Sequence, residues 1–182
     1  MGMQYEAIPS KSQDFIRNQK IFFVGTAGKD GRVNVSPKGM DSFRIIDKHT
    51  VRWLNVTGSG NETAAHVLEN QRMTIMFCAF EGNPLILRLY GNARIVHPSD
   101  KQWTEWAADF PPLPGARQIF ELHVDLVQTS CGFGVPYFDF RQERQQLNQW
   151  AENKDQEKIQ EYWSEKNAVS IDGKPTDMSD IK

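Results

Sequence analysis

Apolar residues recur along most of this chain in short runs that are typical of β-strands. The runs are rich in β-branched and aromatic residues, and turn-forming Gly, Asn, Asp and Pro separate them. They cover residues 20–27, 32–39, 43–47, 51–56, 72–80, 85–97 and 119–130. Because most of the connections are tight turns, we expect neighbouring strands to pair antiparallel.

Other stretches show the apolar spacing of helices. We predict helices over 10–19, 61–70 and 99–109. Beyond residue 140 Gln, Glu and Lys surround spaced aromatic residues, which also favours helices. The whole pattern predicts a mainly β fold, an antiparallel barrel with peripheral α-helices. We divide it into a barrel domain over 1–140 and a C-terminal helical extension over 141–182, packed on the barrel or on a partner subunit.

Composition and charge narrow the classes of partner. The 182 residues carry a formal charge of −2, and the 21 Lys and Arg residues are scattered along the chain. Both features argue against nucleic acid or an anionic membrane as the main partner. No apolar run approaches the roughly 20 residues of a membrane span. Residues 1–13 also lack the layout of a signal peptide, so we expect a cytoplasmic protein.

The chain offers no pattern for binding a metal. Cys78 and Cys131 provide neither a disulfide framework nor the spacing of metal ligands. Glu62 and His66 lie four residues apart on one predicted helix face, but two ligands are too few. We therefore predict no metal site, and we nominate no catalytic acid or base.

One stretch, WLNVTGSGNETAA at 53–65, has a recognisable chemical layout. A strand, a turn of small residues and a helix start follow one another, and this order binds phosphate groups in many proteins. A helix cap without any ligand is one interpretation, because Ser59 and Glu62 fit a capping box and Asn61 is a favourable N-cap residue. A dinucleotide-binding turn is a second. It lacks the third glycine, and turns rather than helices join the strands that follow.

A seat for a monophosphate is the third interpretation. Free N–H groups at the helix start favour an anion, and Asn61 and Thr63 could add side-chain donors. A phosphate also requires a positive charge. Lys38 shares a strand face with Ser36, and Arg88 occupies the corresponding face of its own strand, so both are candidate cations. The alternative is that these faces form the solvated exterior of the barrel. The opposite face of the first strand carries Val33, Val35 and Pro37.

In their order, these segments resemble the pyridoxamine 5'-phosphate oxidase-like family of FMN-binding split barrels, over about residues 20–96. The likeness rests on V-S-P-K-G at 35–39, W-L-N-V at 53–56, a loop and helix from G-S-G-N-E-T to E-N-Q-R, and Y-G-N-A-R at 90–94. The resemblance implies a split antiparallel β-barrel of the FMN-binding type with C-terminal helices. It also implies FMN as the cofactor.

The resemblance assigns residues to this cofactor. The residues implied to lie along the flavin ring and ribityl chain are Ser36, Pro37, Lys38 and Gly39. The residues implied to contact the flavin from the next strand are Leu54 and Asn55. Asn61, Glu62 and Thr63 occupy the loop where the oxidase proper carries a Ser-Arg-Lys phosphate clamp. Because that Arg and Lys are absent, the phosphate would depend on backbone N–H groups and on Lys38 or Arg88. Glu62 would turn back to cap the helix.

The likeness ends before the C-terminus. The vitamin-converting oxidases end with a Trp and an Arg-x-His-x-Arg type segment, whereas residues 129–138 here read TSCGFGVPYF. We therefore expect an FMN-dependent oxidoreductase of unknown substrate that does not efficiently oxidise pyridoxamine or pyridoxine 5'-phosphate. Its expected partners are a second copy, in a homodimer with the flavin at the interface, and a small-molecule substrate or nicotinamide electron donor. The alternative is a non-catalytic flavin or small-ligand binding protein, such as a sensor or a flavin store.

Overall fold

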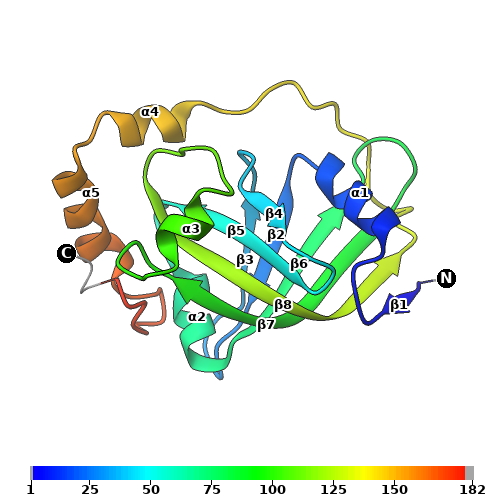
Figure 1. Cartoon of the computed structure of the whole chain (residues 1–182), viewed down its shortest axis with the longest axis horizontal. Coiled ribbons are helices and arrows are strands. Elements are labelled where there is room, and N and C mark those ends of the chain that lie inside the picture. Colours follow the sequence, from blue (N-terminus) through cyan, green and yellow to red (C-terminus); the bar gives the residue numbers. More distant parts are fainter. Residues whose placement is uncertain (1, 179–182) are drawn as a thin grey trace.

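One long strand, β8 (Ala116–Ser130), organises the sheet of this protein. In the computed structural model, which describes residues 2–178, β8 pairs with β7 along most of its length, with β5 along its first half and with β1 near its end. The strand order is β3-β2-β6-β7-β8-β5-β4, with β1 beside β8 and every pair antiparallel. The other strands are β1 (Gln4–Tyr5), β2 (Phe22–Thr26), β3 (Asn34–Lys38), β4 (Phe43–Ile45), β5 (Thr50–Val56), β6 (Arg72–Cys78) and β7 (Ile86–Val96). The predicted mainly β, antiparallel fold is confirmed, as a half-open barrel with edges at β3 and β4 (Figure 1).

Inward-facing side chains of the strands form the main core. Trp53 and Phe120 stack within it, with ring centroids 4.6 Å apart, and both side chains are fully buried. A smaller apolar cluster lies beneath α3 (Trp103–Ala107). Its buried members are Leu54, Val96, Trp106, Phe110 and Ile119. Consecutive residues of β5 therefore serve two different apolar layers, as expected for a strand that is covered on both faces.

Gly91 marks a close approach between two strands. The pairing of β7 with β8 shifts register between Tyr90 and Gly91. A Cβ atom at residue 91 would overlap the backbone carbonyl of His123. The glycine of Y-G-N-A-R is therefore required by the backbone that lies across from it.

Two helices agree with their predictions. α1 is Ser10–Asn18, and α2 is Glu62–Asn70 and packs against β2, β6 and β7. The third predicted helix is shorter than expected, because α3 covers only Trp103–Ala107. Its two tryptophans, Trp103 and Trp106, supply the apolar contacts that hold this short helix on the sheet.

The C-terminal extension is helical only in part. An irregular stretch from 131 to 145, the aromatic segment, leads into three helical elements. These are α4 (Gln146–Glu152), α5 (Gln156–Tyr162) and the π-helix η1 (Trp163–Asn167). Beyond them an isolated bridge joins Val169 to Pro175, so 168–178 forms a small hairpin rather than the predicted helix. Residues 179–182 of the predicted extension lie outside the described residues. The aromatic segment crosses above the barrel, and the hairpin lies beside α2 (Figure 1).

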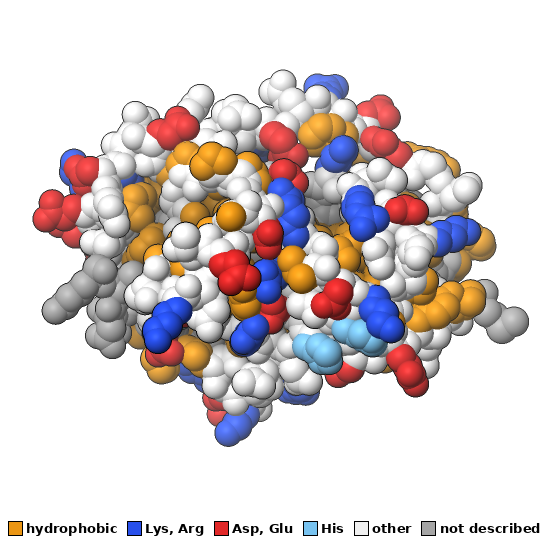
Figure 2. Space-filling view, viewed as in Figure 1, with side chains coloured by type: hydrophobic (Ala, Val, Ile, Leu, Met, Phe, Trp, Pro, Cys, Tyr) orange, Lys and Arg blue, Asp and Glu red, His pale blue; other side chains and the backbone are white. Residues whose placement is uncertain are grey.

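Positive and negative side chains are interspersed over the face shown in Figure 2. Ion pairs join Arg44 to Asp41 and both Arg52 and Arg94 to Glu121. Within residues 2–178 no helix combines the length and apolar character that a bilayer crossing requires. In the same range no group of three or more His, Cys, Asp or Glu side chains is placed to hold a metal ion.

Candidate functional site

The edge strand β3 turns its polar side chains toward the inside of the barrel. Its partners in β2 decide this orientation, because Lys38 lies opposite Phe22 and Ser36 lies opposite Val24. Both partners are buried core residues. Directly opposed residues in an antiparallel pair share a face, so Lys38 and Ser36 also point inward. The same register brings Asn34 opposite Thr26, which is buried.

The outward face of β3 is apolar. It carries Val33, Val35 and Pro37, and the first two are 74% and 64% exposed. Alternation along the sequence predicted two faces but not which one met solvent. For Lys38 the interpretation as part of a solvated exterior is wrong, because the core partners of β3 lie on its polar side.

Lys38 is a partly buried cation that pairs with no carboxylate among residues 2–178. Its Nζ lies 5.0 Å from the centroid of the Trp53 ring, in a cation–π contact. Burial lowers the pKa of Lys38 to about 8, and the charge of nearby Arg117 acts in the same direction. Within the described chain, Ser36 Oγ and Trp53 Nε1 are buried without a hydrogen-bond partner. In the described chain, the inner face of β3 and the facing Trp53 therefore present a cation without an ion-pair partner and polar atoms without a hydrogen-bond partner.

The start of α2 lies beside this inner face. Asn34 donates from Nδ2 to Thr63 Oγ1 at 3.2 Å, which ties β3 to the first turn of the helix. Asn61 is the N-cap residue, but its side chain makes no capping hydrogen bond. Both polar atoms of that side chain are buried and have no partner in the part of the chain that is described. Since the first N–H groups of a helix also lack intrahelical acceptors, unmatched polar groups gather here.

Glu62 does not cap the helix that it opens. Its two carboxylate oxygens accept hydrogen bonds from the backbone N–H of Ile171, at 3.0 and 3.2 Å. The predicted return of Glu62 to the helix start is therefore wrong, and so is the capping box with Ser59. The reason is tertiary, because the C-terminal hairpin supplies an N–H donor more than a hundred residues away in sequence.

The other residues that were expected to contact the flavin do not all lie on the inner face of the barrel. Asn55 is buried on the inner face and donates from Nδ2 to Gln118 Oε1 at 3.3 Å. Its neighbour Leu54 packs in the apolar cluster beneath α3, on the opposite face of β5. Gly39 follows β3 next to the backbone of Lys20. The structure thus places Asn55 on the same face of β5 as Trp53, whose ring Lys38 contacts. It turns Leu54 and Pro37 away from the inner face, contrary to the expectation for both.

Arg88 is not brought to the inner face. It lies opposite Met76, which lies opposite Phe23, which in turn lies opposite Pro37. Because opposed residues share a face, this row points outward. Arg88 Nη1 instead donates to Ser130 Oγ at 3.3 Å.

A second cation, Arg117, is buried and was missed by sequence reasoning. It is 2% exposed, and its Nη1 donates to Gly60 O at 3.2 Å and to Asn167 Oδ1 at 2.6 Å. Burial lowers the pKa of Arg117 to about 10, with Tyr162 acting in the opposite direction, so the side chain stays charged at neutral pH. Among residues 2–178 no carboxylate forms an ion pair with it. The only signal in the sequence was an Arg at the beginning of an apolar strand.

Residues 57–62, the helix-opening turn, are held open on one side. Thr57 anchors the turn, because its N–H and its Oγ1 both donate to Gly115 O. A Cβ atom at Gly58 would meet no heavy atom within 4 Å, so packing within this chain does not explain that glycine. A glycine in open space lets a ligand approach the backbone closely. The turn, the inner face of β3 and the two cations therefore fit an anionic group attached to a planar or apolar body.

Comparison with known proteins identifies the family. The family model described as pyridoxamine 5'-phosphate oxidase matches residues 8–131, which contain β2 to β8 and the helix-opening turn. The chain belongs to the pyridoxamine 5'-phosphate oxidase family. The resemblance inferred from the sequence is confirmed. Residues 132–182, which include α4, α5 and η1, lie outside the matched range.

One relative extends over nearly the whole chain. The pyridoxamine 5'-phosphate oxidase family protein ustO of Aspergillus flavus is 34% identical over 193 aligned positions, which cover 96% of this chain and 78% of that protein. Its likeness therefore reaches into the C-terminal extension, unlike the match to the family as a whole.

Solved structures of other proteins share the fold. HupZ of Group A Streptococcus superposes with a TM-score of 0.53 and 24% identity, over 65% of this chain and 91% of that one. A putative pyridoxamine 5'-phosphate oxidase of Lactobacillus delbrueckii gives 0.54 and 18%, over 68% and 94%. These likenesses agree with the predicted split barrel.

Proposed function

We propose that this chain is an FMN-binding oxidoreductase, with the phosphate at the helix-opening turn and the flavin ring along the inner face of β3. The observation that carries the proposal is the positive charge of Lys38 and Arg117, with which no carboxylate among residues 2–178 pairs, together with the unpartnered polar atoms of Ser36 and Asn61 in the same range. A buried charge that lacks a partner is costly. A phosphate would match it and would accept several charge-assisted hydrogen bonds. Family membership supports the same ligand, because the family resemblance implies FMN.

The residues of the inner face would orient the ligand. A bound flavin supplies the redox chemistry, while the protein supplies position and electrostatics. Gln118 Nε2 is buried without a partner among the described residues and offers a donor to the polar edge of a planar ring. Lys38 favours negative charge on whatever lies beside it. We do not expect efficient oxidation of pyridoxamine 5'-phosphate, because the phosphate of this substrate needs cations of its own. The aromatic segment offers Arg141 for this role, and Arg141 is exposed.

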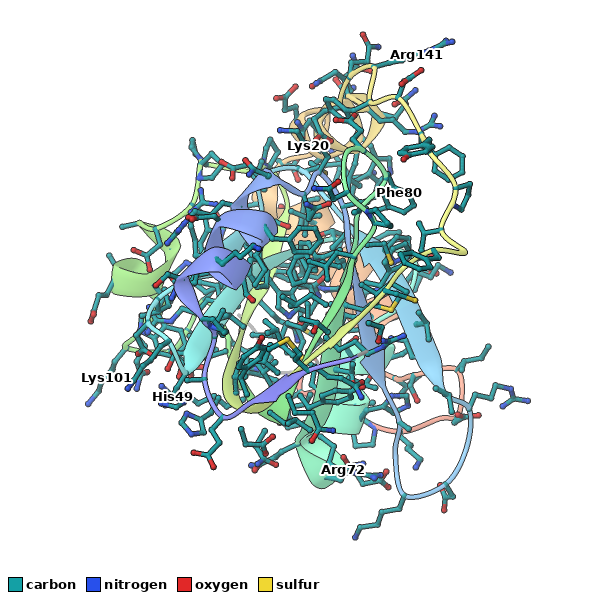
Figure 3. All side chains as sticks on the ribbon, turned by 90° about the vertical axis from the view of Figure 1, so that its right-hand side faces the viewer. Lys20, His49, Arg72, Phe80, Lys101 and Arg141 are labelled. Carbon is teal, nitrogen blue, oxygen red and sulfur yellow. The ribbon has the colours of Figure 1, made fainter. Side chains whose placement is uncertain are left out.

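We further infer a homodimer with the flavin at its interface. β3 is an edge strand of the sheet, and such edges must be covered to prevent uncontrolled pairing. Its outward face is also apolar, with Val33 and Val35 exposed. The aromatic segment adds four exposed side chains, Phe133, Tyr137, Phe138 and Phe140. Figure 3 shows this segment standing out past Phe80 toward Arg141. Clustered exposed apolar side chains are typical of protein interfaces. Glu143 of the aromatic segment lies near Gly39, so this segment passes close to the end of β3.

A second candidate function is non-catalytic binding of a flavin or another small ligand. Amides, hydroxyls and cations line the inner face, and the one carboxylate in the helix-opening turn, Glu62, is occupied by Ile171. The helix-opening turn and the inner face of β3, as described, therefore hold no free carboxylate for acid–base catalysis. Oxidation of NADH or NADPH by the FMN-loaded protein, measured against free FMN, separates the two functions. A rate no higher than that of free FMN favours the binding protein.

Binding is expected to depend on the phosphate. FMN, riboflavin and FAD are titrated into the apo-protein and followed by flavin fluorescence. FMN should bind about 10- to 150-fold more tightly than riboflavin, because losing a charge-assisted hydrogen bond costs about 1.5–3 kcal/mol. Equal affinities for FMN and riboflavin would mean that the phosphate does not occupy the turn.

FMN affinity is also expected to fall at alkaline pH. The pKa of Lys38 is about 8 without ligand, so its ammonium loses its proton across the range from pH 7 to 9. A bound dianion favours the charged form and raises this pKa, so binding takes up a proton. Affinity should decline by up to roughly tenfold per pH unit above the free pKa, and riboflavin should decline less. Titrations of wild type and Lys38→Met at several pH values test this, since a slope that survives in Lys38→Met cannot come from Lys38.

A further inference from the structure

The C-terminal extension is hydrogen-bonded to both ends of the helix-opening turn. Trp163 Nε1 donates to Thr57 Oγ1 at 2.8 Å, near the start of the turn. Asn167 Nδ2 donates to Gly58 O at 3.0 Å. Ile171 N–H reaches Glu62, at its end. The extension therefore lies beside the turn, and Figure 1 shows the same proximity of the C-terminal hairpin to α2.

Arg117 lies at the centre of these contacts but is only partly used. Its Nη1 is occupied by two neutral acceptors, Gly60 O and Asn167 Oδ1. Its Nε is buried with no partner, and its Nη2 donates to no group within residues 2–178. The N–H groups of Nε and Nη2 form one edge of the guanidinium, and two parallel donors on one edge suit the bidentate binding of a phosphate. The side of Arg117 that remains free is thus the side that can hold an anion.

Asn167 fixes the position of this guanidinium. It is fully buried, and both atoms of its amide are occupied, Oδ1 by Arg117 and Nδ2 by Gly58 O. The amide therefore joins the cation to the turn and sets the spacing between them. Because an amide is neutral, it holds Arg117 without cancelling its charge, whereas a carboxylate at the same place would form an ion pair.

We propose that Arg117 is the cation that binds the flavin phosphate and that Asn167 is its positioning residue, which makes the C-terminal extension part of the cofactor site. The proposal rests on the function proposed above and names the group that replaces the absent Arg-Lys pair of the turn. Two further observations support an anion at this place. Within the described chain, Asn61 of the same turn carries two buried polar atoms without a partner, and a Cβ atom on Gly58 would meet no heavy atom within 4 Å.

The test compares FMN with riboflavin on the full-length protein and its variants. In Arg117→Ala, FMN affinity should fall about 10- to 150-fold, which is the loss of one charge-assisted interaction, while riboflavin affinity stays near wild type. Arg117→Lys keeps a charge but loses the bidentate edge, so its loss should be intermediate. Asn167→Asp puts a carboxylate on Arg117 at nearly constant shape, so it should also weaken FMN more than riboflavin. The matched controls are the exposed changes Arg72→Ala and Asn153→Asp, which should leave both affinities unchanged.

The outcomes separate this proposal from the proposed function. If wild type binds both flavins equally, the phosphate assignment itself fails. If wild type prefers FMN and Arg117→Ala keeps that preference, FMN binding stands and the role of Arg117 is refuted. Equal loss of both ligands with a lower melting temperature would also refute it, because Arg117 would then serve only packing. Should Arg117→Ala fail to fold, the FMN-to-riboflavin ratio of Asn167→Asp decides, and an unchanged ratio overturns the proposal.

Discussion

A Val35→Asp variant is expected to be monomeric. Because the proposed dimer holds the flavin at its interface, the monomer should also bind FMN poorly. Val35 lies on the outward face of β3, where it is 64% exposed in the single chain. In the proposed dimer that face is buried, and an uncompensated buried charge costs about 3–5 kcal/mol. The dissociation constant of the dimer should therefore rise by about 100-fold or more. Sedimentation velocity over a wide concentration range, with FMN titrations on the same samples, measures both effects.

The control for this experiment is Val35→Thr. Threonine keeps the shape of valine and its preference for β-strands but adds no charge, so the dimer should persist. Circular dichroism of Val35→Asp should match that of wild type, since the inner face of β3 is untouched. A wild-type protein that is already monomeric with full FMN affinity would contradict the interface, as would a Val35→Asp protein that remains a dimer.

Gly91→Ala is expected to destabilise the fold more than any surface change. The new Cβ would overlap the carbonyl group of His123 on β8, and a backbone cannot move aside as a flexible side chain can. Overpacking costs about 1–3 kcal/mol and occasionally more, so we expect about 3 kcal/mol or more here. Urea unfolding of the apo-protein reports the difference.

Gly25→Ala is the matched control for this second prediction. Gly25 also lies inside a paired strand, β2, but a Cβ there would meet Thr74 O at 3.8 Å, an ordinary contact. The added methyl group reduces the entropy of the unfolded chain, so a neutral or slightly stabilising effect of up to about 1 kcal/mol is expected. Similar losses in both variants would show that Gly91 is not held by close approach to His123.

Much of the fold was readable from local patterns. β2 and β3 are neighbours in the sequence around the turn residues Lys29 to Gly31, and local patterns were enough to predict that they pair. Alternation also sorted the residues of β3 into two groups correctly. It could not say which group faced the core, because that depends on Phe22 and Val24 across the strand pair. The extension that contains Ile171 was predicted to be helical, and the structure has a hairpin there. Contacts with residues far away in the sequence hold this hairpin, so local patterns could not predict it.

The candidate site was predictable only where it is local. The helix-opening turn follows directly from a strand and small residues, and the structure places it as expected beside the inner face of β3. Arg117 contacts Gly60 across 57 residues of sequence and Asn167 across 50. Gly60 belongs to the recognised turn, but neither Arg117 nor Asn167 lies in a motif. The sequence therefore showed that two cations were missing from the turn, but not where a replacement would come from.

The contact of Arg117 with Gly60 has a consequence for how such proteins diverge. The helix-opening turn and β8 are in contact. A basic residue on β8 can therefore supply positive charge at nearly the same position as a basic residue in the turn. Among relatives, we expect positions 62–63 and 117 to exchange basic residues: chains with Arg or Lys in the turn are free to lose the arginine of β8, and chains without them are not. A search that demands the basic pair in the turn would therefore pass over chains that carry the same charge elsewhere.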